Sequence, residues 1–399
     1  MKLKHSLLAA IGAAALLAGP AQADTVGVTD TLIKIGNTAP YSGPASAYGV
    51  IGKTIKAYFD TLSEKGGING RKIEVISLDD GYSPPRTVQQ VRKLVEQEQV
   101  AFTFGTLGTP TNSAIHKYMN QKKVPHLFLA TGASKWGHPD EYPWTMGYQP
   151  PYDIEGEIYA KYVLANVEDP KIAILFQNDD YGKDYRDGFL RGLGDKKDLV
   201  VSMLPYEVTD PTVDSQILAM KASGANVFFN VTVPKFASQA IRKACEIDWK
   251  PLHLLNNVSS SVGAALKPAG LDCSTGLITA QYMKDPTDPQ WKDTDGYKEW
   301  AAWMDEVIPD GDKADVNYVF AYNVSKLLHI MLEGCEDLSR EGIMACAANL
   351  KDVELPMLLP GIKVNTSPTD FYPIQAEQLS KFDGEKWVLF GEVYDASSK

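Results

Sequence analysis

The stretch VAFTFGTLGTPTNSAIHKYM, residues 100–119, orders its residues in a way that suits anion binding. Its first five residues predict a strand, the following glycines a tight turn, and Thr109 with Pro110 the N-cap and first turn of a helix. A helix start presents unpaired N–H groups and partial positive charge, and the Thr109 hydroxyl adds a donor. Because the P-loop and dinucleotide-binding patterns are absent, a carboxylate is favoured over a polyphosphate. Capping for stability alone is the competing interpretation.

Aromatic and hydroxyl-bearing side chains gather in the loops that follow the predicted strands. Tyrosine and tryptophan offer an apolar face with a polar tip, which suits a flat or branched organic molecule. Each could instead be an ordinary surface or packing residue, but as a set they favour ligand binding. They are Tyr41, Ser42, Tyr48, Tyr82, Thr106, Thr109, Thr131, Ser134, Trp136 and Tyr181.

The residue patterns of common catalytic centres are missing. The sequence lacks G-x-S-x-G, H-E-x-x-H and G-x-x-x-x-G-K-[ST]. Its histidines beyond residue 23 are scattered, and structural roles explain them best. The adjacent acids at 79–80 and 179–180 point to opposite sides of a strand end, where turn and capping roles explain them equally well. We therefore expect a protein that is not an enzyme and needs neither metal nor cofactor; a secreted hydrolase is the alternative from a different class.

The N-terminal residues predict export. Residues 1–23 have two lysines, a short apolar run and the cleavage pattern Ala21-Gln22-Ala23, which is typical of a secretory signal peptide cleaved after Ala23. No later run is apolar for long enough to enter a bilayer. We expect a periplasmic chain of 376 residues without direct membrane insertion, which is long enough for two domains of ordinary size.

The charge balance narrows the choice of partners. The full chain has a net charge of −11, and the exported chain has 37 basic residues against 50 acidic ones, a net charge of −13. Such an acidic surface argues against nucleic acid and anionic membranes as partners. It leaves open what a small ligand site would bind.

Four cysteines in an oxidising compartment predict two disulfides. We favour Cys335 with Cys346, which flank a short connection between helical patterns, and therefore Cys245 with Cys273. A zinc site is the rival, but the sequence has no C-x-x-C and no histidine at ligand spacing from these cysteines.

Strands and helices alternate with short connections, which predicts an α/β fold with a parallel sheet covered on both faces. Ligands in such sheets bind at the carboxyl ends of the strands, so the loops 40–48, 79–85, 105–109 and 130–135 should face one crevice. Predicted strands are 31–38, 72–79, 101–104 and 126–129, and helices are 48–65, 85–97 and one starting at 110.

A second unit begins near residues 148–151, where the alternation starts again. Strands are predicted at 171–176, 200–206, 226–231, 252–255 and 276–282, and helices at 154–165, 183–192, 215–223 and 235–246. Helices at 297–306, 317–335 and 340–350 follow, and then a hairpin of 374–382 and 386–394. Two lobes of similar size suggest a cleft between them.

Several motifs resemble those of the solute-binding proteins of branched-chain-amino-acid-type ABC transporters. They are IGNTAPYSGP with Tyr48-Gly49, KGGINGRKI at 65–73, Asp79-Asp80, Val124-Pro125 and DYGK at 180–183. The resemblance implies a type I periplasmic binding protein, with two doubly wound parallel-sheet lobes joined by three hinge crossovers near residues 146–149, 282 and 372. The lobes would be 24–147 with 283–371, and 148–282 with 372–399. Such a monomer would trap a ligand by lobe closure and dock on a membrane permease.

The resemblance also implies a set of ligand-binding residues. The carboxylate-binding hydroxyl falls on Thr109, and the aromatic walls fall on Tyr48 and Tyr181. Tyr41 and Tyr82 are further candidates from the crevice loops. The neighbouring backbone falls on Ala130, Thr131 and Gly132.

Two positions depart from the pattern of amino-acid-binding members. Those members hold the α-ammonium with a Ser or Thr hydroxyl and with an acid in the second lobe, where this chain has Gly132 and Asn257. An ammonium buried without its carboxylate partner loses a charge-assisted bond. We therefore expect a small carboxylate without the amine, most simply an aromatic or arylalkenoic acid. A branched-chain amino acid or amide is the alternative, favoured if Glu155 or Glu246 lines the cleft.

Overall fold

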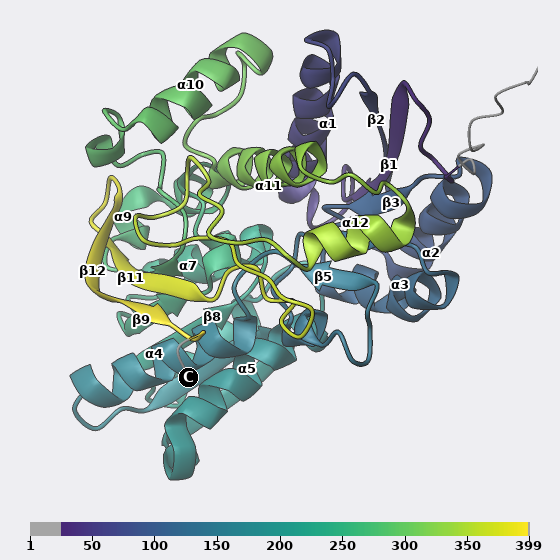
Figure 1. The fold of residues 1–399 in the computed structure, drawn as a ribbon. Coiled ribbons are helices and arrows are strands. Elements are labelled where there is room, and N and C mark those ends of the chain that lie inside the picture. Colours follow the sequence, from purple (N-terminus) through teal and green to yellow (C-terminus); the bar gives the residue numbers. More distant parts are fainter. Residues whose placement is uncertain (1–24, 398–399) are drawn as a thin grey trace, which may run out of the picture.

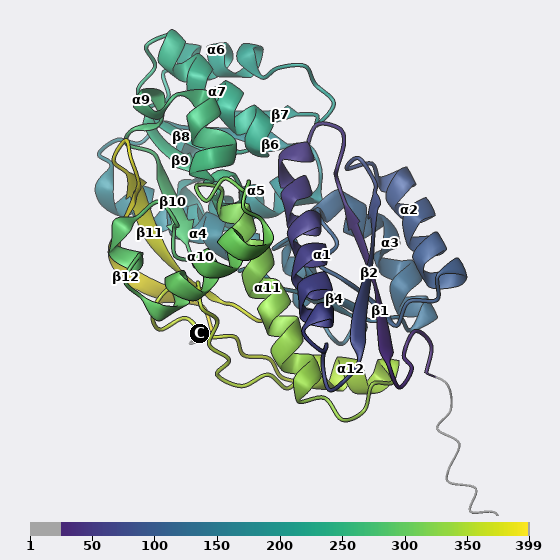
Figure 2. The same cartoon turned by 90° about the horizontal axis from the view of Figure 1, so that it is seen from above.

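The computed structural model describes residues 25–397. Two β-sheets lie side by side, each covered by helices, and together they form two lobes (Figures 1 and 2). The predicted signal peptide, residues 1–23, and its cleavage site lie outside the described residues. Across residues 25–397, no helix combines the length and the apolar character needed to cross a lipid bilayer.

The first sheet is entirely parallel and has the strand order β2-β1-β3-β4-β5. Its strands are almost wholly buried from β3 onward, as expected for a parallel sheet with both faces covered. The strands are β1 (Leu32–Ala39), β2 (Lys72–Asp79), β3 (Phe102–Phe104), β4 (His126–Leu129) and β5 (Thr145–Gly147).

Helices from two distant parts of the chain cover this sheet. Helix α1 (Gly49–Glu64) packs beside α11 (Val316–Glu333), so a late segment completes the first lobe (Figure 2). On the opposite face α2 (Pro84–Arg92) packs against α3 (Thr109–Lys122). Helices α10 (Asp295–Val307) and α12 (Arg340–Ala347) flank α11 along the chain.

The second sheet has the strand order β12-β11-β10-β9-β8-β6-β7, in which β11 and β12 are antiparallel to their neighbours. The C-terminal hairpin thus extends an otherwise parallel sheet, as the yellow strands in Figure 1 illustrate. The strands are β6 (Ile172–Gln177), β7 (Val200–Tyr206), β8 (Val227–Val231), β9 (Leu252–Leu255), β10 (Ile278–Gln281), β11 (Ala376–Phe382) and β12 (Trp387–Asp395).

Helices α4 (Tyr152–Asn166) and α5 (Asp180–Leu193) pack unusually closely on this sheet. A Cβ added to Gly188 would lie 2.0 Å from the carbonyl oxygen of Asp153, so only glycine permits this approach. The other helices of the lobe are α6 (Asp214–Ala222), α7 (Pro234–Glu246) and the short α8 (Lys267–Ala269) and α9 (Leu271–Ser274).

The chain passes between the sheets three times: after β5, after β10 and before β11. The predicted α/β class with two lobes and three crossovers is confirmed. Both favoured disulfides are present: Cys245 with Cys273 beside α7 and α9, and Cys335 with Cys346 between α11 and α12.

The helix predicted over 85–97 is present. It is a regular α-helix up to Arg92 and continues as a wider π-type helix over Lys93–Gln97. The stretch 257–274, for which no element was predicted, contains several short helical segments. Segments this short lack the amphipathic period on which sequence prediction depends.

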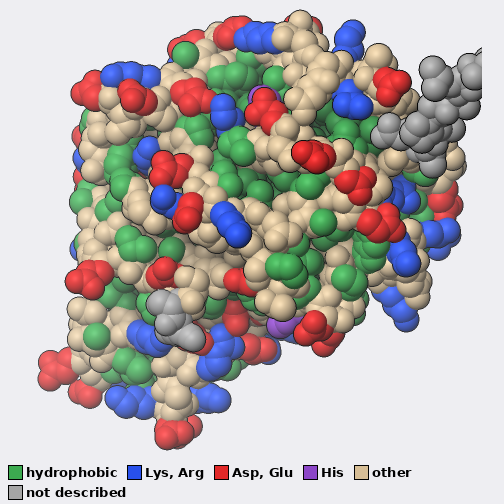
Figure 3. All heavy atoms as spheres, in the orientation of Figure 1, with side chains coloured by type: hydrophobic (Ala, Val, Ile, Leu, Met, Phe, Trp, Pro, Cys, Tyr) green, Lys and Arg blue, Asp and Glu red, His purple; other side chains and the backbone are tan. Residues whose placement is uncertain are grey.

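Charged side chains of both signs are spread over the visible face in Figure 3. Among the described residues only a few large hydrophobic side chains are exposed, and they lie apart in sequence.

Candidate functional site

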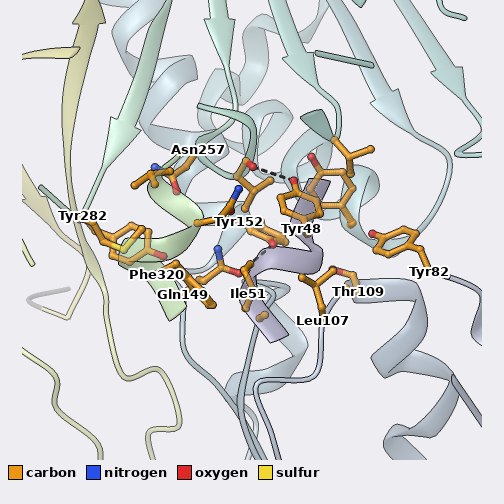
Figure 4. Close-up of a pocket in the computed structure, with 18 residues that line it drawn as sticks. Tyr48, Ile51, Tyr82, Leu107, Thr109, Gln149, Tyr152, Asn257, Tyr282 and Phe320 are labelled. Atoms are coloured by element: carbon orange, nitrogen blue, oxygen red, sulfur yellow. Dashed lines mark hydrogen bonds between the residues drawn. The ribbon is translucent and has the colours of Figure 1, made fainter. Parts of the chain in front are cut away.

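A small cavity of about 50 Å³ lies between the lobes (Figure 4). One water-sized group needs roughly 10–15 Å³, so the cavity has room for a few such groups. The first lobe contributes Tyr48, Ile51, Tyr82, Leu107, Gly108, Thr109, Ala130, Val316, Asn317 and Phe320. The second contributes Tyr152, Tyr181, Val233, Asn257 and Val258, and the crossover segments contribute Gln149, Tyr282 and Met283.

Thr109 lies at the start of α3, but it is not the N-cap that we predicted. Gly108 holds that position with a φ of 97°, and no side chain caps the helix. The Thr109 hydroxyl instead lies 2.6 Å from the Thr131 hydroxyl. This arrangement leaves Thr109 at the cavity wall, on the first helical turn.

The hydrogen bonds around Thr131 bear on where the Thr109 hydrogen points. Thr131 Oγ1 accepts from Trp136 Nε1 at 3.3 Å and from the backbone N–H of Ala133 at 3.4 Å. Either hydroxyl of the Thr109–Thr131 pair can be the donor. When Thr131 donates, the Thr109 hydrogen is free for a ligand acceptor, which suits a carboxylate.

Tyr48 connects the two lobes across the cavity. Its hydroxyl donates to the carbonyl oxygen of Val258 over 2.9 Å, as the dashed line in Figure 4 marks. Burial raises the pKa of Tyr48 well above its usual value, so the phenol is a neutral donor at physiological pH. The ring forms a cavity wall, and the bond stabilises the closed arrangement of the lobes.

Tyr181 forms another wall and is held rigidly. Its hydroxyl donates to the carbonyl oxygen of Thr232 at 3.1 Å and accepts from Asn256 Nδ2 at 2.7 Å. The carboxylate of Asp179 caps α5 by accepting from the backbone N–H of Tyr181 and of Gly182. The Tyr181 hydroxyl thus both donates and accepts within the protein, so Tyr181 contributes the face of its ring to the cavity.

Tyr82 has a backbone φ of 59°, in the left-handed region that aromatic residues rarely adopt. Asp80 holds this turn, because its carboxylate accepts from the Tyr82 N–H at 2.9 Å and from the Thr87 hydroxyl at 2.9 Å. The Tyr82 ring lies over Gly108, where an added Cβ would come within 2.5 Å of it. Strained backbone held in this way is typical of functional sites.

Tyr152 is a wall residue that the sequence analysis missed. It begins α4, and its ring stacks on Tyr185 with centroids 4.4 Å apart and meets Tyr181 edge-on. The ring also lies against Gly132. A tyrosine directly after the two prolines of the first crossover was the available signal.

Glu155 lies behind the cavity and does not line it. Its carboxylate accepts from the Tyr159 hydroxyl at 2.7 Å, the Tyr185 hydroxyl at 2.5 Å and the backbone N–H of Asn257 at 2.7 Å. Burial raises the pKa of Glu155 to about 7. Glu377 is also buried, has no hydrogen-bond partner at either carboxyl oxygen, and has a raised pKa because of burial and the nearby Glu155. Glu246, at the end of α7, is exposed.

Polar contacts between the lobes flank the cavity. Asp184 on α5 accepts from the Ser134 N–H and hydroxyl, both at 2.7 Å, and burial raises the pKa of this carboxyl to about 6. Ser261 donates to Asp315 at 2.8 Å in a second cluster. Together with the Tyr48 bond, these contacts hold the lobes closed.

The cavity brings together six of the nine predicted site residues, namely Tyr48, Tyr82, Thr109, Ala130, Tyr181 and Asn257. Thr131 and Gly132 lie directly behind its wall. Tyr41 lies outside it, because its hydroxyl bonds to Ser77 and its ring lies beneath Lys53. Within residues 25–397, no group of three or more His, Cys, Asp or Glu side chains is placed to hold a metal ion.

A family model described as periplasmic binding protein matches residues 32–386. Leu/Ile/Val-binding protein homolog 7 of Brucella suis is 27% identical over 297 residues, covering 71% of this chain and 70% of that protein.

Solved structures share the fold at lower sequence identity. A branched-chain amino acid ABC transporter protein from Thermus thermophilus with bound valine has a TM-score of 0.81 at 13% identity, covering 93% of this chain and 98% of that one. A fatty acid ABC transporter substrate-binding protein from Thermomonospora curvata has a TM-score of 0.76 at 20% identity, covering 93% and 94%.

Proposed function

Because this chain belongs to the periplasmic binding protein family, we propose that it traps a small organic carboxylate between its lobes for an ABC importer. Proteins of this class bind small molecules and deliver them to a membrane permease. The expected periplasmic location agrees with the family. We assign residues 24–147 with 283–371 to one lobe and 148–282 with 372–399 to the other, because the chain crosses three times between the sheets. Residues 24, 398 and 399 of this assignment lie outside the described residues.

The carboxylate would bind at the start of α3. The Thr109 hydroxyl would donate to the ligand while it accepts from the Thr131 hydroxyl, which lies 2.6 Å away. The helix start adds partial positive charge at the same point. None of the described residues that line the cavity is Lys or Arg, so these neutral donors would carry the recognition.

The polarity of the lining supports an aromatic or arylalkenoic acid. Within residues 25–397, no Asp or Glu lines the cavity, so a buried α-ammonium would lack a charged partner. The hydroxyl that amino-acid-binding relatives are implied to use is replaced by Gly132, whose side-chain space the Tyr152 ring takes. The observation that carries the proposal is this uncharged wall of five tyrosines and Phe320.

A branched-chain amino acid is the second candidate. The Brucella relative is named a Leu/Ile/Val-binding protein homolog, and the Thermus structure contains valine. The cavity volume of about 50 Å³ also suits a compact ligand better than a cinnamate. The fatty acid neighbour favours a carboxylate without an ammonium.

A thermal-shift screen of the purified protein would separate these candidates. Benzoates and cinnamates form one set, and leucine, isoleucine, valine and phenylalanine the other. A ligand at about 100 times its Kd stabilises the folded state by about 2.7 kcal/mol, which raises Tm by several degrees. A shift with the acids alone supports the proposal, and a shift with the amino acids alone contradicts its ligand class. Recovery of unchanged ligand by mass spectrometry would argue against the hydrolase alternative.

A further inference from the structure

Asn257 is fixed in one orientation by its hydrogen bonds. Its backbone N–H donates to Glu155 at 2.7 Å, and its side-chain Nδ2 donates to the carbonyl oxygen of Ala280 and to Gln281 Oε1 at 3.3 Å. A backbone carbonyl can only accept, so the atom facing Ala280 is the nitrogen. The amide cannot be turned over without placing two oxygens together.

This orientation leaves Asn257 Oδ1 as the polar atom available to a ligand. Both amide hydrogens are used within the second lobe, and the side chain lines the cavity although the residue is only 7% exposed. Once a ligand covers this oxygen, leaving it without a donor costs roughly 1–3 kcal/mol. A ligand that supplies a donor would therefore be preferred over one that does not.

Asn317, on the first lobe, is another asparagine that lines the cavity. Its backbone N–H and its Nδ2 donate to Asp315 Oδ1 at 3.0 and 2.8 Å, which turns its own Oδ1 away from that carboxylate. Asn317 is 7% exposed and lines the same cavity. Asn317 is thus a second uncharged polar side chain at the cavity, with its Nδ2 bonded to Asp315.

Asn257 and Thr109 lie on opposite sides of the cavity (Figure 4). Thr109 offers a donor for a carboxylate, whereas Asn257 offers an acceptor. Resting on the proposed function, we infer that the ligand is a hydroxylated acid, whose hydroxyl, on the end far from the carboxylate, donates to Asn257. An amide acceptor without charge suits a neutral hydroxyl better than an ammonium.

Isothermal titration calorimetry with matched ligand pairs tests this inference on the wild-type protein. 4-Hydroxybenzoate is compared with 4-fluorobenzoate, and 4-hydroxycinnamate with 4-fluorocinnamate, because fluorine is close in size to a hydroxyl but cannot donate. We expect the hydroxylated acid of a pair to bind roughly tenfold or more tightly. Equal affinities, or tighter binding of the fluoro acid, would overturn the inference and leave the proposed function intact.

The variant Asn257→Leu tests the assignment to this residue. We expect the preference for the hydroxylated acid to fall to about twofold or less. Asn323→Leu is the control, because Asn323 is buried on α11, bonds to the Met357 N–H and does not line the cavity. An unchanged preference in Asn257→Leu would remove Asn257 from the site. If leucine or valine binds and no aromatic acid does, the proposed ligand class fails, and the inference fails with it.

Discussion

The ring of Tyr152 lies against Gly132 so closely that a Cβ on Gly132 would come within 2.7 Å of ring atom Cε1. The same Cβ would lie 2.3 Å from the carbonyl oxygen of Pro150. Position 132 therefore accepts no side chain while the first crossover keeps this path. The Tyr152 ring that forms a cavity wall also occupies the space that a side chain at position 132 would need, so no hydroxyl can stand there.

We predict that Gly132→Ser lowers both stability and ligand affinity. The new side chain displaces either the Tyr152 ring or the crossover backbone, and overpacking of this kind costs about 1–3 kcal/mol. Chemical denaturation and calorimetry measure the two effects. Gly334→Ala is the control, because its added Cβ meets no atom closer than 3.9 Å and its φ is −91°. A stable Gly132→Ser variant with unchanged affinity would contradict the packing argument.

We predict that Thr109→Val weakens ligand binding by about 1–3 kcal/mol, because a donor to a charged carboxylate is lost. Valine keeps the shape of threonine, so the fold should be unaffected. Thr103→Val is the matched control, since the Thr103 hydroxyl is buried in β3 without a partner and lies outside the cavity lining. Calorimetry with the acid identified by the thermal-shift screen measures the change. Equal affinities of the two variants would exclude Thr109 from the site.

Tyr48→Phe isolates the hydrogen bond between the lobes. The ring remains as a wall, but the bond to the Val258 carbonyl is lost, which costs the closed form about 0.5–1.5 kcal/mol. We expect affinity to fall several-fold, mainly through faster ligand release, in stopped-flow experiments. Tyr318→Phe on α11 is the control. We expect it to bind and release the ligand at the wild-type rates, because Tyr318 is outside the cavity lining. If Tyr48→Phe released the ligand at the wild-type rate, the bond to Val258 would not stabilise the closed form.

The buried acids Glu155 and Glu377 predict a dependence of stability on pH. Their pKa values are raised in the folded protein, Glu155 to about 7, so the folded state binds protons more tightly than the unfolded chain. Stability from this source is complete below the ordinary pKa of glutamate and is lost as the pH rises toward about 7.

Glu377→Gln removes one of these acids while keeping its size. We expect the variant to be more stable than the wild type at pH 8 by about 1–3 kcal/mol, and similar at pH 5. Denaturation at the two pH values provides the measurement. Comparing the two proteins at each pH cancels the titration of Asp184 and Asp285, whose pKa values are raised to about 6. A pH-independent difference would argue against proton linkage at this pair.

Much of the fold could be predicted from sequence because its signals are local. The strands at 200–206 and 252–255 have the predicted bounds, and Pro110 marks the start of α3. Thr109 was misplaced by one cap position because Gly108, with positive φ, already provides the turn. Short-range patterns locate a helix or strand well, but its terminal residues are uncertain by about one position, and so is the assignment of the cap.

Most of the remaining cavity residues could not be assigned to the cavity because they meet only in three dimensions. Gln149 and Tyr282 lie at crossovers that were expected, and Phe320 lies on a late helix, but nothing in the sequence brings these three side chains to one cavity. The orientation of Asn257 depends on Ala280 and Gln281 of β10. Such contacts arise from topology, on which single-sequence periodicity carries no information.

The C-terminal hairpin also determines when this molecule can finish folding. Strand β10 pairs with β11 at Ile278 and Lys381, and α1 packs on α11, so each lobe needs segments far apart in the chain. Pairings of such long range form slowly. A chain that emerges N-terminus first cannot complete its second sheet before residues 376–395 have emerged. Each lobe is therefore completed late, and the chain stays unfinished through most of its synthesis or passage across a membrane.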